Sequence, residues 1–382
     1  MAALDRAPAG DHAGHAVDDA ADDRTSLGLF AVLLSAALVL HVLWWHGLVV
    51  GSPWFAVVLA AAWTVARPTA VVRLLVLLAA AAVAIVAELP ALGTHLLLVL
   101  VLAGCLAVDV GVRSVRARTL LGAGAVFRGL RPFLRAELVV LYLAAALSKL
   151  NADYLDPATS PAGDLSAHVV WFDPTLLDGS WHVGPAIWGS LALELGLPLL
   201  LLWPRTRTVA LVVGLGFHGV LALAGTVPFT ALMLALYVAF LPDRVLRPLG
   251  AAARTSSGTR VVVLGVLVLL WVVVGLTADV SPGRTTGDVL ASATRVLVAG
   301  GALGLAAVVV ATARAGAGAR PRSGRDLRPT YAAGVVLLVL VAASPYLGHR
   351  VGDAFTMYSA LDTSPRGWNH EILPRGVRLL GR

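Results

Sequence analysis

The chain has 382 residues, of which 58% are hydrophobic and 13% are charged, and its mean hydropathy is +0.85. A soluble domain of this length cannot bury that much apolar surface, so the composition excludes an ordinary soluble protein. The net charge is +7, but the arginines lie in short segments between apolar runs, which is typical of membrane topology rather than of nucleic-acid binding. The single cysteine, Cys105, excludes an intrachain disulfide.

Continuous apolar runs of about 15 to 24 residues predict membrane-spanning helices rather than the short alternating strands of a barrel. We therefore expect an all-α, polytopic transmembrane bundle of about eleven spans. The polar and acidic residues 1–26 lack the basic start of a signal peptide and predict a disordered cytoplasmic tail. The spans are expected near 27–50, 52–66, 70–88, 91–110, 132–151, 183–203, 206–224, 227–241, 259–277, 290–313 and 330–345.

The distribution of arginine predicts how the bundle is oriented. With a cytoplasmic N-terminus, Arg284 is the only arginine in the external loops between spans, as the positive-inside rule requires. We therefore expect a multi-pass protein of the plasma (inner) membrane, with residues 346–382 as an external C-terminal tail. The acidic, aromatic segment 150–182 falls outside and is either a cap over the outer face or a solvated connector.

Lys149 is the only lysine in the chain and lies at the outer end of the fifth expected span. Arginine does not release its proton at accessible pH, whereas a desolvated lysine can. A neutral Lys149 amine could therefore act as a general base. The alternative is a lysine that extends to the membrane surface and anchors the end of its helix.

Other polar side chains fall within the expected spans. His41, His46, His95 and His218 lie in the outer half, where they either hydrogen-bond between packed helices or form a site. Glu194 lies deep in the sixth span, so we expect it to be protonated or paired, as a proton-relay residue or as a contact between helices. The sequence has no nucleotide-binding or zinc-protease motif, and we expect no metal site.

Four stretches resemble vitamin K-dependent gamma-carboxylases and the related bacterial horizontally transferred transmembrane (HTTM) proteins. LYLAAALSKLNADY is similar to the family's lysine-containing segment, and GFHGVLALAGTVPFTALMLALYVAFLPD to its Phe-His segment. GTHLLLVLVLAG resembles its Asn-His-rich helix start, and FTMYSALDTSPRGWNHEILP its C-terminal tail. The stretches are Leu141–Tyr154, Gly216–Asp243, Gly93–Gly104 and Phe355–Pro374. We expect the HTTM-like domain to cover residues 27–345.

The resemblance implies a quinol-dependent reaction. It makes Lys149 the base that deprotonates menaquinol or vitamin K hydroquinone, and His95 its catalytic partner. It also implies O2 and CO2 as co-substrates and carboxylase-like chemistry of the carbon–carbon lyase type. We expect four residues to bind the cofactor: His218, Asn151, Tyr154 and Glu194. Membrane lipids and a secreted or periplasm-facing peptide are the expected partners, without nucleic acid.

The chain departs from the family pattern in two respects. Ser148 stands where the family has the first lysine of its pair, and Asn151 and Tyr154 replace an Asp and a Trp. We also expect the large lumenal domain that holds the protein substrate to be missing. The leading hypothesis is therefore a quinol-binding enzyme without that domain. The alternative is a non-enzymatic membrane transporter or lipid-binding scaffold, in which the polar groups only join helices.

Overall fold

The computed structural model describes residues 10–89, 93–170, 173–177, 179–242, 244–246, 249, 286–314, 327–349 and 354–379. Within these ranges the protein is all-helical, without a strand, as predicted. The long helices are α1 (Gly10–Trp45), α2 (Pro53–Ala66), α3 (Val71–Ala87), α4 (Thr94–Ala117), α5 (Ala123–Ser148), α8 (Val183–Leu202), α9 (Arg207–Leu223), α10 (Val227–Tyr237), α13 (Thr286–Arg314) and α14 (Pro329–Ala343).

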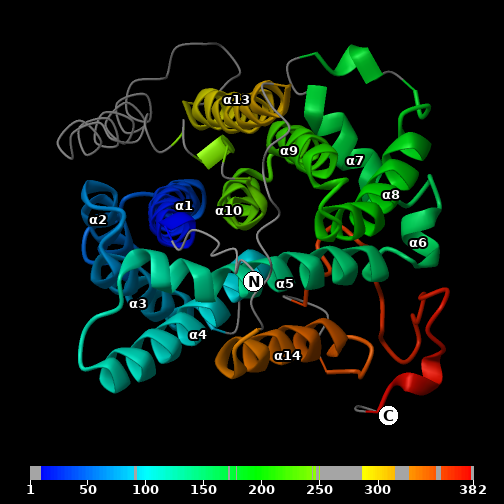
Figure 1. The fold of residues 1–382 in the computed structure, drawn as a ribbon. Coiled ribbons are helices and arrows are strands. Elements are labelled where there is room, and N and C mark those ends of the chain that lie inside the picture. Colours follow the sequence, from blue (N-terminus) through cyan, green and yellow to red (C-terminus); the bar gives the residue numbers. More distant parts are fainter. Residues whose placement is uncertain are drawn as a thin grey trace, which may run out of the picture.

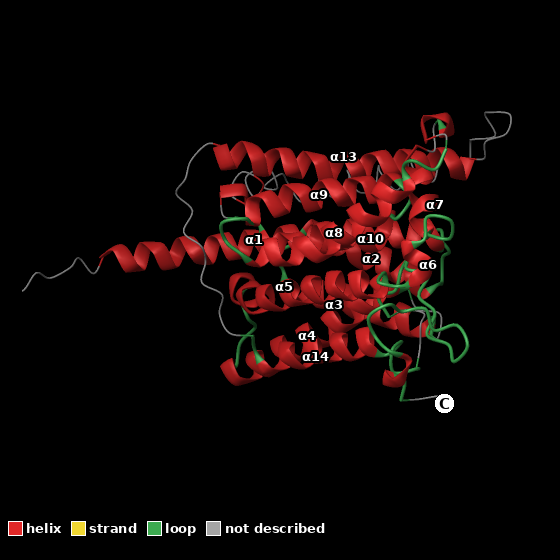
Figure 2. Ribbon diagram, turned by 90° about the vertical axis from the view of Figure 1, so that its right-hand side faces the viewer, coloured by secondary structure: helices red, strands yellow, loops and turns green. Residues whose placement is uncertain are grey.

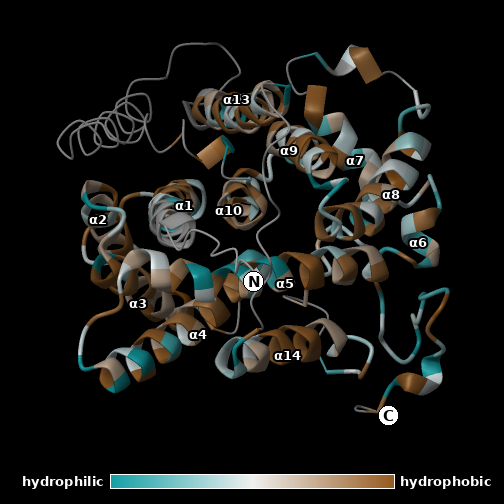
Figure 3. Ribbon diagram, in the orientation of Figure 1, coloured by the Kyte–Doolittle hydropathy of each residue, from teal (hydrophilic) through white to brown (hydrophobic). Residues whose placement is uncertain are grey.

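These helices run side by side in one bundle (Figure 2). Four segments among the described residues are long and apolar enough to cross a membrane: Asp22–Trp45, Thr94–Ala117, Val183–Leu202 and Leu290–Arg314. Apolar residues cover the helices on the outside of the bundle as well (Figure 3), and large ones such as Leu59, Val83, Leu199 and Leu340 are exposed. Helices that are apolar all round require a hydrocarbon surrounding. The chain is a membrane protein.

The apolar runs locate most helices well, because nothing interrupts them. Observed α3, α8 and α9 begin and end within two residues of the expected spans 70–88, 183–203 and 206–224. The expected span 259–277 lies outside the described residues.

Two helices differ from expectation at their charged ends. Helix α1 already begins at Gly10, so the tail expected to be disordered is helical from that residue onward, and α5 begins at Ala123 rather than near 132. At the start of α5, two ion pairs join the helices: Asp23 on α1 contacts Arg128 (3.2 Å) and Arg131 (3.1 Å) on α5. Paired charges can extend a helix where their polarity alone indicates a loop.

Helix α5 lies in the middle of the bundle and contacts α1, α4, α8, α10 and α14 (Figure 1). A second buried acidic side chain lies at the same end of the bundle as Asp23 and also pairs with arginine. Asp109 on α4 contacts Arg113 at 3.0 Å and Arg328 at 2.8 Å. Glu137 of α5 is completely buried.

The opposite end of the bundle carries the short helices α6 (Ala152–Leu155) and α7 (Pro161–Ala167), together with the C-terminal segment (Figure 2). That segment is held by backbone hydrogen bonds to the end of α5: the Ala152 amide donates to the Asn369 carbonyl (2.9 Å), and the Glu371 amide donates to the Leu150 carbonyl (3.0 Å). The tail therefore packs directly beside Lys149.

Candidate functional site

Lys149 is the C-cap residue of α5, one position beyond Ser148. Its amide hydrogen-bonds to the carbonyl of Ala146 (3.1 Å), which closes the last turn of the helix. The side chain does not extend toward solvent, since the residue is only 7% exposed. The geometry therefore differs from that of a surface anchor, whose charged head stays in water.

Lys149 and Glu194 form a buried pair. Nζ of Lys149 lies 2.5 Å from Oε1 of Glu194 in α8, and both side chains are 8% exposed. The second carboxylate oxygen, Oε2, is buried without a hydrogen-bond partner among the described residues. Pro198, four residues further along α8, has no N–H and cannot bond the Glu194 carbonyl, which loosens the helix at this point. The expectation that Glu194 is paired is met by Lys149.

Tyr154 is the third predicted residue at this place. Its ring lies 5.7 Å from Nζ of Lys149, within the range of a cation–π contact. Its hydroxyl lies 2.6 Å from Oγ of Ser190, which is one helical turn before Glu194 on the same face of α8. Burial raises the pKa of Tyr154 to about 12, so the phenol stays neutral and keeps its proton as a hydrogen-bond donor.

These groups line a cavity with mostly apolar walls. The empty space between its walls is about 590 Å³, a figure that includes the part open to solvent. All four stretches that carry the family resemblance contribute to it. They supply Thr94; Leu141, Ala145, Lys149 and Tyr154; Phe217, Leu221, Thr226 and Phe229; and Phe355, Met357 and Tyr358. Residues of α7 and α8, Ala162, Leu165, Ser190 and Glu194, complete the lining.

The tail forms its part of the cavity wall in a constrained conformation. Phe355 and Tyr358 both have positive φ, 62° and 53°, a region that costs energy for residues other than glycine. Asn151 fixes this segment: its Nδ2 donates to the carbonyls of Ser148 (2.7 Å) and Ser359 (2.6 Å). Its Oδ1 accepts the amide of Tyr154 (2.9 Å), capping α6. Asn151 is thus placed to hold the cavity wall, and it is not itself among the lining residues.

His218 lies behind the cavity. It is completely buried in α9, with Nε2 2.8 Å from the Tyr142 hydroxyl, which in turn lies 2.6 Å from the Tyr237 hydroxyl. The lining residues Phe217 and Phe229 pack against its ring. His218 was expected to bind the cofactor, but it is not among the cavity-lining residues, and its contacts favour a role in supporting the aromatic wall.

His95 lies apart from the lysine. It follows Thr94 in the first turn of α4, but its Nε2 hydrogen-bonds to Nδ1 of His41 at 3.0 Å, and it is not among the cavity-lining residues. His41 in turn lies beside His46 and Trp54. The structure therefore brings together Lys149, Glu194 and Tyr154, and it places His95 in a separate histidine cluster.

Sequence reasoning overlooked several residues of the cavity. Ser190 has no local signal, because its role depends on Tyr154 packing against α8. Phe355, Met357 and Tyr358 lie in the C-terminal tail, whose resemblance to the family does not assign a role to any one residue. That resemblance was the signal available for the tail.

The comparisons with known proteins agree with the family resemblance. Residues 89–243 match the family model of the HTTM domain. No curated protein and no solved structure matches the chain. The matched range contains the Lys149 segment, Glu194 and the Phe-His segment, so the central part of the cavity lies in the HTTM domain. The match agrees with the predicted resemblance to the HTTM family over this part of the chain.

Proposed function

We propose that the chain is a quinol-binding membrane enzyme in which Lys149, paired with Glu194, takes up the proton of a quinol hydroxyl. The observation that carries the proposal is a buried Lys–Glu pair at 2.5 Å in the wall of an apolar, aromatic cavity. Desolvating such a pair costs free energy, and replacing it with apolar residues is often neutral or stabilising. Stability alone therefore does not account for the pair. Buried ionisable groups in a cleft are candidates for catalysis.

The residues present fit a quinol ring. Phe217, Phe229 and Phe355 offer apolar faces to a flat aromatic group. Glu194 Oε2, buried and without a partner among the described residues, is a free acceptor for a hydroxyl donor. The neutral phenol of Tyr154 lies in the same wall. The apolar surface of the bundle suits an isoprenoid tail. When bound, a menaquinol or vitamin K hydroquinone supplies the oxidisable ring whose reaction with O2 generates a strong base.

The Lys149–Glu194 pair can act as one proton acceptor. One proton is shared between Nζ and Oε1, so the pair is either an ammonium beside a carboxylate or an amine beside a carboxylic acid. In the second form the acid proton on Oε1 occupies the lone pair of the Lys149 amine, so the quinol proton enters at Oε2, which has no partner among the described residues, while the shared proton moves to Nζ. After that transfer the pair is an ammonium beside a carboxylic acid, and the ammonium lies next to the oxyanion left behind. The low exposure of both groups limits the contact of the pair with water as a competing proton source.

The proposal includes the topology inferred from arginine: about eleven spans in the plasma membrane, with a cytoplasmic N-terminus and an external C-terminus. In support, the end of α5 that carries Lys149 also carries α6, α7 and the C-terminal segment (Figure 2). The buried Asp23 and Asp109, with their arginine partners, lie at the opposite end. The cavity then opens outward, toward a secreted or periplasm-facing substrate and CO2.

The test compares the wild-type protein, purified in detergent, with Lys149→Arg and Lys149→Ala. Bound quinone is extracted and measured by mass spectrometry, and oxidation of an added hydroquinone is followed in the presence of O2 and bicarbonate. Arginine can pair with Glu194 but cannot release a proton. We expect Lys149→Arg to retain bound quinone and lose turnover by roughly 10²- to 10⁴-fold, and Lys149→Ala to lose both.

Glu137→Gln is the matched control, since Glu137 is a buried carboxylate of α5 outside the cavity. It should leave quinone content and turnover near those of the wild type. Full turnover in Lys149→Arg would refute the base. An intact, folded wild-type protein that holds no quinone and oxidises none would favour the alternative, a transporter or lipid-binding scaffold in which the pair only joins α5 to α8.

A further inference from the structure

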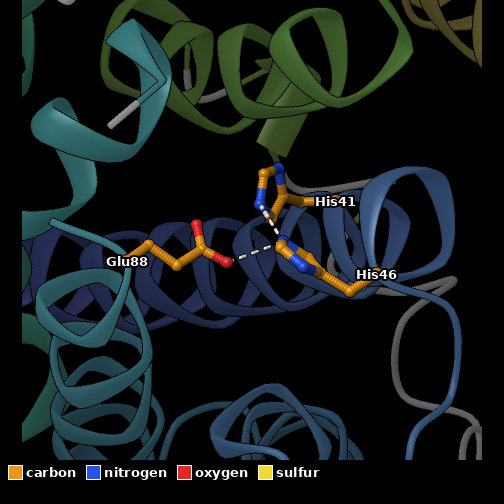
Figure 4. A group of neighbouring side chains, drawn as sticks. All are labelled: His41, His46 and Glu88. Carbon is orange, nitrogen blue, oxygen red and sulfur yellow. Dashed lines mark hydrogen bonds and ion pairs between the residues drawn. The ribbon is translucent and has the colours of Figure 1, made fainter. Parts of the chain in front are cut away.

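A second polar cluster lies at the same end of the bundle, where four helices begin or end. His41 is near the end of α1, and His46 is the first residue after that helix. Glu88 is the C-cap of α3, and Trp54 is in the first turn of α2. His95 is in the first turn of α4. Figure 4 shows that the side chains of His41, His46 and Glu88 point toward one another. None of them lines the Lys149 cavity.

One ring nitrogen of this cluster is shared between two neighbouring groups. Nε2 of His46 faces two groups at once: Nε2 of His41 at 3.3 Å and Oε1 of Glu88 at 3.1 Å. An imidazole nitrogen has one in-plane position, filled either by a proton or by a lone pair. A protonated Nε2 can divide its hydrogen between His41 and Glu88 in a three-centre bond, whereas a deprotonated Nε2 turns its lone pair toward the carboxylate. The three ligand atoms therefore converge on one small volume, which either a shared proton or a cation can occupy.

We propose that His41, His46 and Glu88 bind a divalent transition-metal ion, with Zn²⁺ as the preferred metal. A cation between the three atoms turns each of the facing lone pairs into a favourable contact. Zn–N and Zn–O bonds of about 2.0–2.1 Å in a tetrahedral site separate neighbouring ligand atoms by about 3.3–3.4 Å. The observed separations of 3.3 Å and 3.1 Å are close to this value, and all three atoms lie within 4.8 Å of one another.

The surrounding groups are those that orient metal ligands. Nδ1 of His41 hydrogen-bonds to Nε2 of His95 at 3.0 Å, which can fix the His41 tautomer so that Nε2 presents its lone pair to the metal. The indole N–H of Trp54 donates to Oε1 of Glu88 at 2.5 Å. The Trp54 ring also stacks on His46, with centroids 4.8 Å apart and planes 18° from parallel. Each of the three ligands thus has a neighbour that limits its rotation.

The chemistry of the ligands selects the metal. Two imidazoles and one carboxylate suit zinc and the later first-row metals better than Mg²⁺ or Ca²⁺, which prefer oxygen ligands alone. Three protein ligands leave the fourth tetrahedral position for water or a substrate. Ions can enter from the surface, because the side chains of His46 and Glu88 are each 26% exposed. The sequence gives no zinc motif, since the ligands come from separate helix ends.

The test uses the full-length protein carrying an affinity tag without histidine, stripped with a chelator and titrated with Zn²⁺ by calorimetry. We expect one Zn²⁺ per chain in the wild type. Glu88→Gln, which keeps the shape of the side chain, should weaken binding at least 10-fold, and His46→Ala at least as much. His95→Ala should cost roughly 10- to 100-fold, the usual effect of losing a group that orients a ligand. His168→Ala, an exposed histidine of the outer segment, is the matched control and should bind Zn²⁺ as the wild type does.

Co²⁺ provides a second readout, because four-coordinate Co²⁺ absorbs visible light far more strongly than the hydrated ion. The wild type should show this absorption at one equivalent, and Glu88→Gln should lose it while remaining folded by circular dichroism. Absence of Zn²⁺ binding in the wild type would overturn the proposal. So would equal Zn²⁺ affinity in the wild type, Glu88→Gln and His46→Ala, which would indicate adventitious binding at other histidines.

Discussion

Removing one member of the Lys149–Glu194 pair should destabilise the protein far more than removing both. Each side chain is 8% exposed and the two charged atoms are 2.5 Å apart, so solvent screens the pair little. Lys149→Met or Glu194→Leu alone leaves an uncompensated buried group, which costs about 3–5 kcal/mol. The double variant replaces the pair with apolar side chains among Leu141, Ala145 and Phe217. We expect it to be within about 1–2 kcal/mol of the wild type or more stable.

The assay is reversible unfolding in mixed micelles of dodecyl sulfate and a mild detergent, followed by the fluorescence of the ten tryptophans. The four proteins form a double-mutant cycle, and the coupling between Lys149 and Glu194 should be at least about 2 kcal/mol. Glu371→Gln, an exposed carboxylate in the tail, is the control and should change stability by no more than about 0.5 kcal/mol. Additive losses in the double variant would show that the two side chains do not interact.

Three further predictions concern the surroundings of the cavity. Gly214→Ala places a methyl group on the Tyr237 hydroxyl oxygen and should cost about 1–3 kcal/mol by overpacking, whereas Gly216→Ala, with no atom within 4 Å of its new methyl group, should be neutral or slightly stabilising in the same unfolding assay. Burial lowers the pKa of His370 below 6.5; because the unfolded chain then binds more protons than the folded one, stability should fall as pH drops below about 6.5, and His370→Gln should flatten that dependence in thermal melts. Asn151→Ala removes the bonds that hold the tail and should cost about 1–3 kcal/mol and speed tryptic cleavage of the tail.

The apolar helices could be predicted because each depends on local composition. Uninterrupted apolar runs such as those of α3 and α8 predict a single helix each, and the predicted ends lie within two residues of the observed ones. The start of α5 could not be predicted, because Arg128 and Arg131 indicate a loop unless Asp23, more than a hundred positions earlier, is known to lie beside them. Helix boundaries that depend on a distant partner carry no local signal.

The candidate site shows the same division. The single lysine and the family resemblance identified Lys149, and the high cost of a carboxylate in a membrane predicted that Glu194 is protonated or paired. Whether Lys149 and Glu194 pair with each other depends on how α5 and α8 are rotated about their axes. The sequence does not determine this rotation. The resemblance of the tail likewise gave no role to Phe355 or Tyr358, which reach the cavity because Asn151 holds the tail against the end of α5.

His95 shows how one residue position separates the two sites. Successive residues in a helix point about 100° apart, so Thr94 can line the Lys149 cavity while His95 contacts His41. A loose sequence match to a helix start cannot resolve a single position, and the assignment of His95 as partner of Lys149 depended on that position. His95→Ala separates the two roles: we expect its main effect in Zn²⁺ affinity. Loss of hydroquinone oxidation at unchanged Zn²⁺ affinity would instead place His95 functionally with Lys149, and the histidine cluster would then be part of the proton path.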